Sequence, residues 1–146
     1  GCDAYRANAA AYDARLAETE AKVKADLAAI PAERRTIISS HDAFGYFASA
    51  YGLTFLAPEG LSTEAEASAA DVAALIRQVR EDKASAIFVE SIANARLVEQ
   101  IATETGLTIG GTLYSDALSG EDGPAATYID MMLHNAATIR GAILGP

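Results

Sequence analysis

The chain has 146 residues, of which 51% are hydrophobic, and it carries a formal net charge of −9. This length fits one domain of ordinary size, and such a chain buries roughly 68–70% of its unfolded surface when it folds. The acidic balance argues against nucleic-acid binding and against polybasic attachment to membranes, since both need a basic face. No apolar run approaches the ~20 residues that span a bilayer.

A long helix is expected at the start of the chain, from Asp3 as its N-cap to about Ala29. Its apolar side chains recur at helical spacing along one stripe, formed by Tyr5, Ala9, Tyr12, Leu16, Val23, Leu27 and Ile30. Pro31 ends the helix, because proline disfavours the helical conformation of the residue before it. At 1.5 Å per residue the helix spans about 40 Å, which is long for so small a domain.

From Glu33 onward, short apolar runs alternate with amphipathic segments. Strands are expected at 36–39, 53–57, 86–90 and 107–114. Helices are expected at 43–51, from a Ser68 cap to about Asp82, from Asn94 to Thr105 with Gly106 as C-cap, and at 127–144. Ser62 or Thr63 opens a loop, and a second loop covers 115–126. This alternation predicts an α/β fold in which the long helix precedes a four-stranded parallel sheet with helices on both faces.

Polar residues follow three of the four expected strands. His41 comes after the first strand, Glu90 ends the third, and Asp116 comes after the fourth. In an open parallel sheet, ligands bind outside the carboxyl ends of the strands, so these side chains gather at one edge. Imidazole and carboxylate together are ligands suited to zinc, manganese or iron.

Each of these residues also has a structural interpretation. Asp42 precedes an apolar helix, and we expect it to cap that helix. His41 and Glu90 remain open between structural hydrogen bonding and a role at a metal site. His134, within "MMLHNAATI", is expected to be a satisfied structural histidine, with Met131 and Met132 as core residues rather than thioether ligands.

Cys2 is the one cysteine of a chain that does not begin with methionine. It is either the lipid-anchored cysteine of a mature bacterial lipoprotein or a residue from mid-chain or from cloning. We favour the second interpretation, because a lipoprotein usually places a flexible tether after its cysteine, whereas a helix is expected here at once.

Three segments carry a resemblance to a known family. They read "ISSHDAFGYFASAYGL", "AIFVES" and "GGTLYSDALS…TYIDMMLHNAATI", and they are preceded by "YRANAAAYDARLAE". In order and spacing these segments resemble the C-terminal lobe of the zinc- and manganese-type solute-binding proteins of ABC transporters, the TroA- and ZnuA-like cluster A-I group. The first segment of the chain is similar to the long helix that links the two lobes of these proteins.

The resemblance implies two α/β lobes joined by a rigid helix, with one divalent metal held between them. It implies that residues 1–30 are the inter-lobe helix and that residues 31–146 are the C-terminal metal-binding lobe. The metal ligands that it implies in this lobe are His41 of "HDAFGYF" and Asp116 of "YSDAL". Glu90 is implied to lie behind these ligands and to orient His41.

The N-terminal lobe, which the resemblance implies would supply two more histidine ligands, has no counterpart in this chain. We therefore expect an excised lobe or a natural half-length relative that binds zinc or manganese weakly. The family implies a periplasmic or extracytoplasmic place, membrane anchoring in the full-length protein, and an ABC permease as partner. Two copies that share one metal would restore four ligands, so metal-dependent self-association is a further expectation.

Two other functional classes stay open as alternatives. One is a structural or interaction domain in which the metal residues are vestigial. The other is a metal-dependent hydrolase, suggested by the His41–Asp42 doublet, although His134 is the only other histidine. The sequence has no dinucleotide loop, phosphate loop or nucleophile elbow, so we expect a protein that is not an enzyme.

Overall fold

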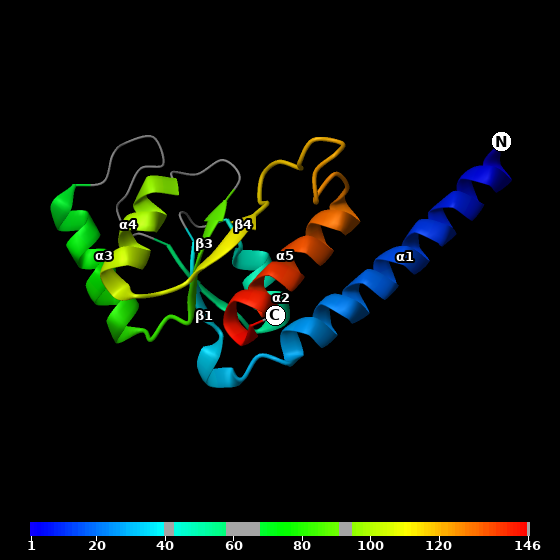
Figure 1. Cartoon of the computed structure of the whole chain (residues 1–146). Helices are drawn as coiled ribbons and strands as arrows, with labels where there is room; N and C mark the ends of the chain where they lie inside the picture. Colours follow the sequence, from blue (N-terminus) through cyan, green and yellow to red (C-terminus); the bar gives the residue numbers. More distant parts are fainter. Residues whose placement is uncertain (40–42, 58–67, 91–94, 146) are drawn as a thin grey trace.

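A four-stranded parallel sheet forms the centre of the molecule, as the sequence predicts (Figure 1). The computed structural model describes residues 1–39, 43–57, 68–90 and 95–145. The strands are β1 (Thr36–Ile38), β2 (Thr54–Leu56), β3 (Ala86–Glu90) and β4 (Ile109–Leu113), in the spatial order β2-β1-β3-β4. The helices are α1 (Cys2–Ala28), α2 (Gly45–Tyr51), α3 (Ala69–Glu81), α4 (Ala95–Thr105) and α5 (Tyr128–Leu144), with a 3₁₀ turn at Ala32–Arg34.

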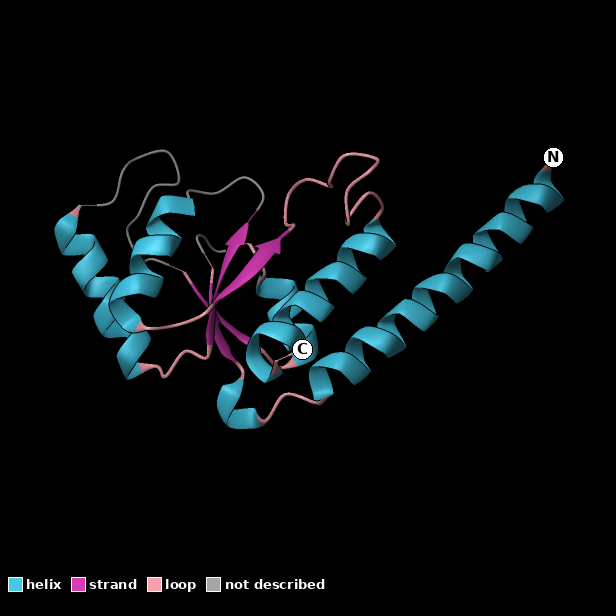
Figure 2. Ribbon diagram, in the orientation of Figure 1, coloured by secondary structure: helices cyan, strands magenta, loops and turns pink. Residues whose placement is uncertain are grey.

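Helices cover both faces of the sheet (Figure 2). Successive residues of a strand point to opposite faces, and the strands use this alternation to build two cores. Ile37 of β1 and Phe88 of β3 belong to the core under α1, α2 and α5, whereas Ile38 and Ile87 belong to the core under α3 and α4. The central strands are therefore apolar on both sides, which is the pattern of a parallel sheet buried between helices.

The start of two helices differs from the sequence prediction. Helix α1 begins at Cys2 with Gly1 as N-cap and has no side-chain cap, so the predicted Asp3 cap is wrong, and Asp3 lies in the first turn. A carboxylate is favourable there because of the positive end of the helix dipole. Helix α2 begins at Gly45, and its N-cap is Phe44 rather than Asp42, again without a side-chain cap. Asp42 itself lies outside the described residues.

Other predicted boundaries are confirmed. Ser68 caps α3 in a reciprocal capping box with Asp71, and its hydrogen bonds lower the pKa of the Asp71 carboxyl. Gly106 follows α4 with a φ of +73° and donates its N–H to the Ala102 carbonyl at 2.9 Å. Strand β3 has the predicted bounds, and the other three strands are shorter than predicted. The predicted loop start at Ser62 or Thr63 and helix start at Asn94 lie outside the described residues.

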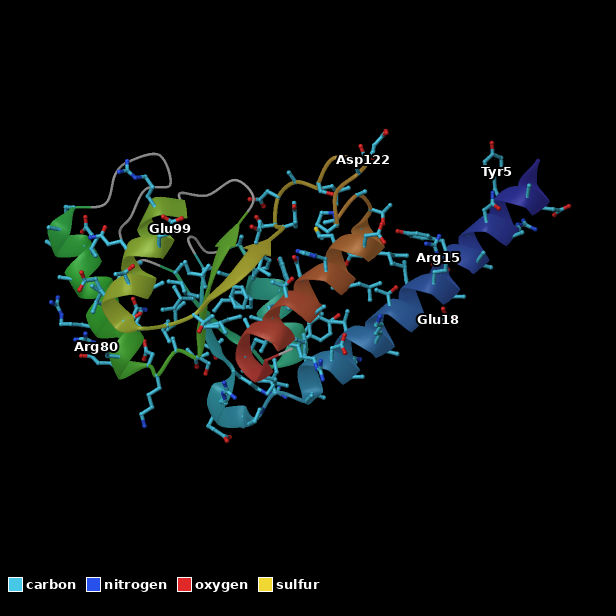
Figure 3. All side chains as sticks on the ribbon, in the orientation of Figure 1. Tyr5, Arg15, Glu18, Arg80, Glu99 and Asp122 are labelled. Atoms are coloured by element: carbon cyan, nitrogen blue, oxygen red, sulfur yellow. The ribbon has the colours of Figure 1, made fainter. Side chains whose placement is uncertain are left out.

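Helix α1 is buried only near its C-terminal end. Thr19, Val23 and Leu27 are its buried residues, and this end packs mainly against α5. The N-terminal part extends away from the rest of the molecule (Figure 1), and Figure 3 shows Tyr5 on this part. Tyr5 and Tyr12 are 77% and 44% exposed. The apolar stripe of α1 is thus longer than the surface available to cover it.

One arginine joins the end of α1 to the body of the domain. The guanidinium of Arg35 donates from Nε to the Ile30 carbonyl at 3.0 Å, from Nη2 to Leu27 at 3.2 Å and from Nη1 to Tyr51 at 3.1 Å. Leu27 and Tyr51 lie in the last turns of α1 and α2, where carbonyls lack helical partners. Arg35 therefore fixes the direction in which α1 leaves the domain.

The glycine pair of β4 serves the packing of the sheet. A side chain at Gly110 would place its Cβ 2.1 Å from the Phe88 ring, so only glycine fits there. Gly111 has a φ of +104°, and the pairing of β4 with β3 is irregular at this point. The pair makes room for the core phenylalanine and a bulge in β4, which agrees with the sequence-based conclusion that "TIGGTL" is not a dinucleotide loop.

Candidate metal centre

The carboxyl ends of the strands meet at one edge of the sheet, and the topology marks one place along it. The connection from β1 to β2 runs through α2 on one face, whereas those from β2 to β3 and from β3 to β4 run through α3 and α4 on the other. The strand order therefore reverses between β1 and β3. Ligands of open α/β sheets bind outside the carboxyl ends at such a switch point.

The structure describes two of the three sequence-predicted site residues, Glu90 and Asp116, and both lie at this edge. Glu90 is the last residue of β3 and is paired in register with Leu113, three residues before Asp116. Asp116 is exposed in the segment that follows β4. His41, three residues after the end of β1, lies outside the described residues. Among the residues that are described, no group of three or more His, Cys, Asp or Glu side chains is arranged to hold a metal ion.

Two consecutive residues of α5 hold the end of β4. Asn135, which is buried, donates from Nδ2 to the Tyr114 carbonyl at 2.8 Å and accepts from the Tyr114 N–H at 3.0 Å. His134 bonds through Nε2 to the Thr112 carbonyl at 2.9 Å, and its ring meets the Tyr114 ring edge-on at 5.4 Å. The prediction that His134 is a satisfied structural histidine is therefore confirmed.

A hollow of about 450 Å³ opens beside the same edge, between α2, α5 and the residues after β4. Its walls are mostly aromatic and thioether side chains: Ala43, Phe44, Tyr46, Phe47, Ala50, Tyr51, Tyr114, Ser115, Tyr128, Met131, Met132 and Asn135. Burial raises the pKa of Tyr51, and the nearby Glu20 and Tyr128 raise it further, so its phenol is neutral. Sequence reasoning missed this hollow, because the aromatic residues of "FGYFASAYG" do not indicate that side chains of α5 complete its walls.

Two hydrogen bonds between Ser119 and Ala125 close the loop between β4 and α5. The Ser119 N–H donates to the Ala125 carbonyl at 2.9 Å, and the Ala125 N–H donates to Ser119 Oγ at 3.0 Å. Thr127 then caps α5 by accepting from the Asp130 N–H. The segment that contains Asp116 is therefore held at both ends. Asn135 holds the main chain before it, and the hydrogen bonds between Ser119 and Ala125 hold the chain after it.

Comparison with known proteins identifies the family. The model of the family described as "ZnuA: Zinc-uptake complex component A periplasmic" matches residues 1–142. The chain belongs to this family. This is a family of solute-binding proteins rather than of enzymes, so the hydrolase alternative is rejected, and the fold and the family resemblance drawn from the sequence are confirmed.

Relatives in the ZnuA family share moderate identity with the chain. The zinc-binding protein TroA of Treponema pallidum is 38% identical over 138 residues, with 91% of this chain and 45% of TroA covered. The manganese-binding lipoprotein MntA of Bacillus subtilis is 36% identical over 146 residues, with 97% and 48% covered. The chain therefore spans about half the length of these relatives.

Solved structures give the same family assignment. The structure of TroA superimposes with a TM-score of 0.80 and covers 91% of this chain and 50% of TroA. The manganese-bound periplasmic metal-binding protein of Candidatus Liberibacter asiaticus is 29% identical and superimposes with a TM-score of 0.81 over 95% of this chain and 51% of that one. The long helix and the α/β domain together thus match one half of a larger ZnuA-family molecule.

Proposed function

We propose that this chain is the half of a ZnuA-family solute-binding protein that holds a zinc or manganese ion through His41 and Asp116. Residues 1–30 act as the inter-lobe helix, and residues 31–146 act as the metal-binding lobe. The family match over residues 1–142 carries this proposal. The position of Asp116 after β4, at the edge that contains the switch point, supports it.

The chemistry of the proposed ligands fits either metal. His41 contributes a neutral imidazole nitrogen and Asp116 a carboxylate oxygen, and Glu90 at the end of β3 orients the imidazole. The family includes a relative named for zinc and others named for manganese, and both metals accept this mixed set of ligands. In this account the metal is cargo: it is captured and released without chemical change.

The proposed partners are an N-terminal lobe and an ABC permease. The relatives are about twice as long as this chain, which leaves room for a second lobe before α1. The exposed apolar stripe on α1, with Tyr5 and Tyr12, provides a surface for that lobe to cover. The names of the relatives as periplasmic proteins or lipoproteins support an extracytoplasmic place, with membrane anchoring in the longer protein. None of the described helices combines the length and apolar character needed to cross a membrane.

Two protein ligands form half of a site, so the chain alone is expected to bind metal weakly. High-affinity zinc sites normally use three or four protein ligands, and we expect a dissociation constant above about 1 μM for zinc here. Titration of the wild type against His41→Ala and Asp116→Ala tests this, and each variant should bind at least about tenfold more weakly. Submicromolar 1:1 binding by the monomer would contradict the half-site, and equal affinity of all three proteins would favour the vestigial, purely structural alternative.

The half-site also supports self-association in the presence of metal. Two copies that bring their His41 and Asp116 together around one ion would complete a four-ligand shell. Sedimentation velocity with and without zinc measures this directly. A dimer that forms with zinc and disappears with chelator or with Asp116→Ala is the expected result, and a monomer under all conditions would exclude it.

A further inference from the structure

We propose that Asn135 of α5 is a positioning residue for the metal ligand Asp116, and that it acts by fixing the main chain at the end of β4. This inference rests on the proposed function, because it takes Asp116 as a ligand. It concerns a residue on a different element from any of the predicted ligands.

The side-chain amide of Asn135 replaces a neighbouring strand. Its Nδ2 donates to the Tyr114 carbonyl at 2.8 Å, and its Oδ1 accepts from the Tyr114 N–H at 3.0 Å. An amide side chain carries one donor and one acceptor in the same plane, so it pairs with the two backbone groups of one residue as a β-strand would. Asn135 is only 2% exposed, which keeps water from competing for these two bonds.

The pairing matters because β4 is an edge strand. Among the described strands its partner is β3, and β4 ends at Leu113. Backbone groups on the open edge of a sheet need other partners when they are buried. The α5 side chains supply them at Thr112, through His134, and at Tyr114, through Asn135. The main chain at the end of β4, from Thr112 to Tyr114, is therefore held by side chains of α5.

Asp116 follows Tyr114 by two residues in the chain. Consecutive Cα atoms are 3.8 Å apart, so only two such steps along the main chain separate the fixed Tyr114 from Asp116. Metal–oxygen distances tolerate only about 0.2 Å, and supporting residues behind ligands typically change metal affinity by 10–100-fold. Ser115 lies between Tyr114 and Asp116. Its hydroxyl is buried and has no hydrogen-bond partner within the described part of the chain, so this side chain does not help to hold the segment.

Helix α5, which carries Asn135, is in turn packed against the long helix α1. Val23 and Leu27 of α1 share one core with Ile139 and Ile143 of α5, and α1 packs mainly against α5. The helix that supplies the Asn135 amide is thus held by the helix that points toward the proposed second lobe. This places the ligand segment after β4 and the long helix on one rigid support.

The test compares the zinc affinity of variants of the 146-residue chain. The affinity is measured from the NMR shifts of the Ser115 and Asp116 amides during titration with Zn²⁺. Asn135→Ala should weaken binding about tenfold or more. Ile101→Val, a buried change on α4 in the core on the other face of the sheet, is the matched control and should bind within twofold of wild type. In zinc-free protein, hydrogen exchange of the Tyr114 amide should accelerate in Asn135→Ala and not in Ile101→Val.

A second variant covers the case in which Asn135→Ala fails to fold. Asn135→Asp keeps the acceptor for the Tyr114 N–H but sets a carboxylate oxygen against the Tyr114 carbonyl, so it should also lose affinity. Wild-type affinity in either folded Asn135 variant, while Asp116→Ala loses binding, would overturn the inference, as would an equal loss in Ile101→Val. If Asp116→Ala itself binds like wild type, the proposed function fails, and the role of Asn135 fails with it.

Discussion

The residue on which the proposed site depends most is His41, because only the neutral imidazole binds a metal. An ordinary histidine side chain has a pKa of about 6.5, and its protonated form has no lone pair for a ligand bond. The pH dependence of metal binding near pH 6.5 therefore reports on the imidazole.

Zinc affinity is expected to fall as pH decreases through about 6.5, approaching tenfold per pH unit below it. Protons then compete with the metal for His41, whereas above this pH the affinity should level off. Titrations at pH 5.5, 6.5 and 7.5 measure the effect. The slope should vanish in His41→Ala, and a wild-type affinity that is the same at all three pH values would argue against a histidine ligand.

Two glycines offer a test of packing at the same scale. Gly110→Ala should destabilise the protein by roughly 1–3 kcal/mol, because the new Cβ would collide with the Phe88 ring in the core. Gly141→Ala on α5 is the control: its Cβ meets nothing within 4 Å, and alanine favours the helix by about 0.5–1 kcal/mol. Urea denaturation should show opposite shifts, and two shifts of the same sign would contradict this packing.

At the scale of the elements, Arg35 is the residue that fixes α1 to the domain. It satisfies carbonyls at the ends of two helices, and Gly52 leaves the space that its guanidinium occupies, since a Cβ there would lie 3.2 Å from Nη1. A cation is also favoured at helix C-termini by the helix dipole. The direction of the long helix is thus held by hydrogen bonds as well as by the α1–α5 contact.

Arg35→Met should lower the free energy of unfolding by about 2 kcal/mol, because hydrogen bonds from a charged donor are worth roughly 1.5–3 kcal/mol and their carbonyls lose a partner. Arg34→Met is the matched control, since Arg34 is exposed on the neighbouring turn, and it should change stability by less than about 0.5 kcal/mol. Equal effects of the two variants in urea denaturation would show that the three bonds of Arg35 contribute nothing.

The sequence predicted the elements well because their signals are local. Apolar periodicity, the Ser68 cap and the Gly106 C-cap each act within one turn, and all three are confirmed. The predicted cap at Asp3 was wrong, because an acidic residue is also favourable inside the first turn, where Asp3 lies, and the N-cap of α2 is Phe44 rather than Asp42. The pairing of Asn135 with Tyr114 spans 21 residues, and no local pattern marks it.

The site was predictable only in part. Strand ends carrying His41, Glu90 and Asp116 predict an edge with ligand chemistry, and the structure puts Glu90 and Asp116 at that edge, with His41 outside the described residues. Their roles as ligands remain a prediction. The aromatic hollow depends on how α2 and α5 approach each other, which is a tertiary property that residues such as Tyr46 and Tyr128 do not reveal by spacing alone.

At the scale of the whole molecule, the chain is one half of a ZnuA-family architecture. A helix whose N-terminal part extends beyond its own domain, and relatives of about twice the length, are both consistent with a second lobe on that helix. Metal affinity, selectivity and delivery would then be shared between two halves. In the proposed function, this half would contribute the carboxylate of Asp116 and the imidazole of His41.

The central claim, that His41 binds metal at this edge, is tested most directly by long-range ¹H–¹⁵N NMR of the histidine rings during zinc titration. The chain has two histidines, and His134 is an internal control because its Nε2 already bonds to the Thr112 carbonyl. The account predicts that zinc shifts the ring nitrogens of His41 and leaves those of His134 unchanged, with no shift in Asp116→Ala at the same zinc concentration. A shift of His134 alone, or of neither ring, would contradict it.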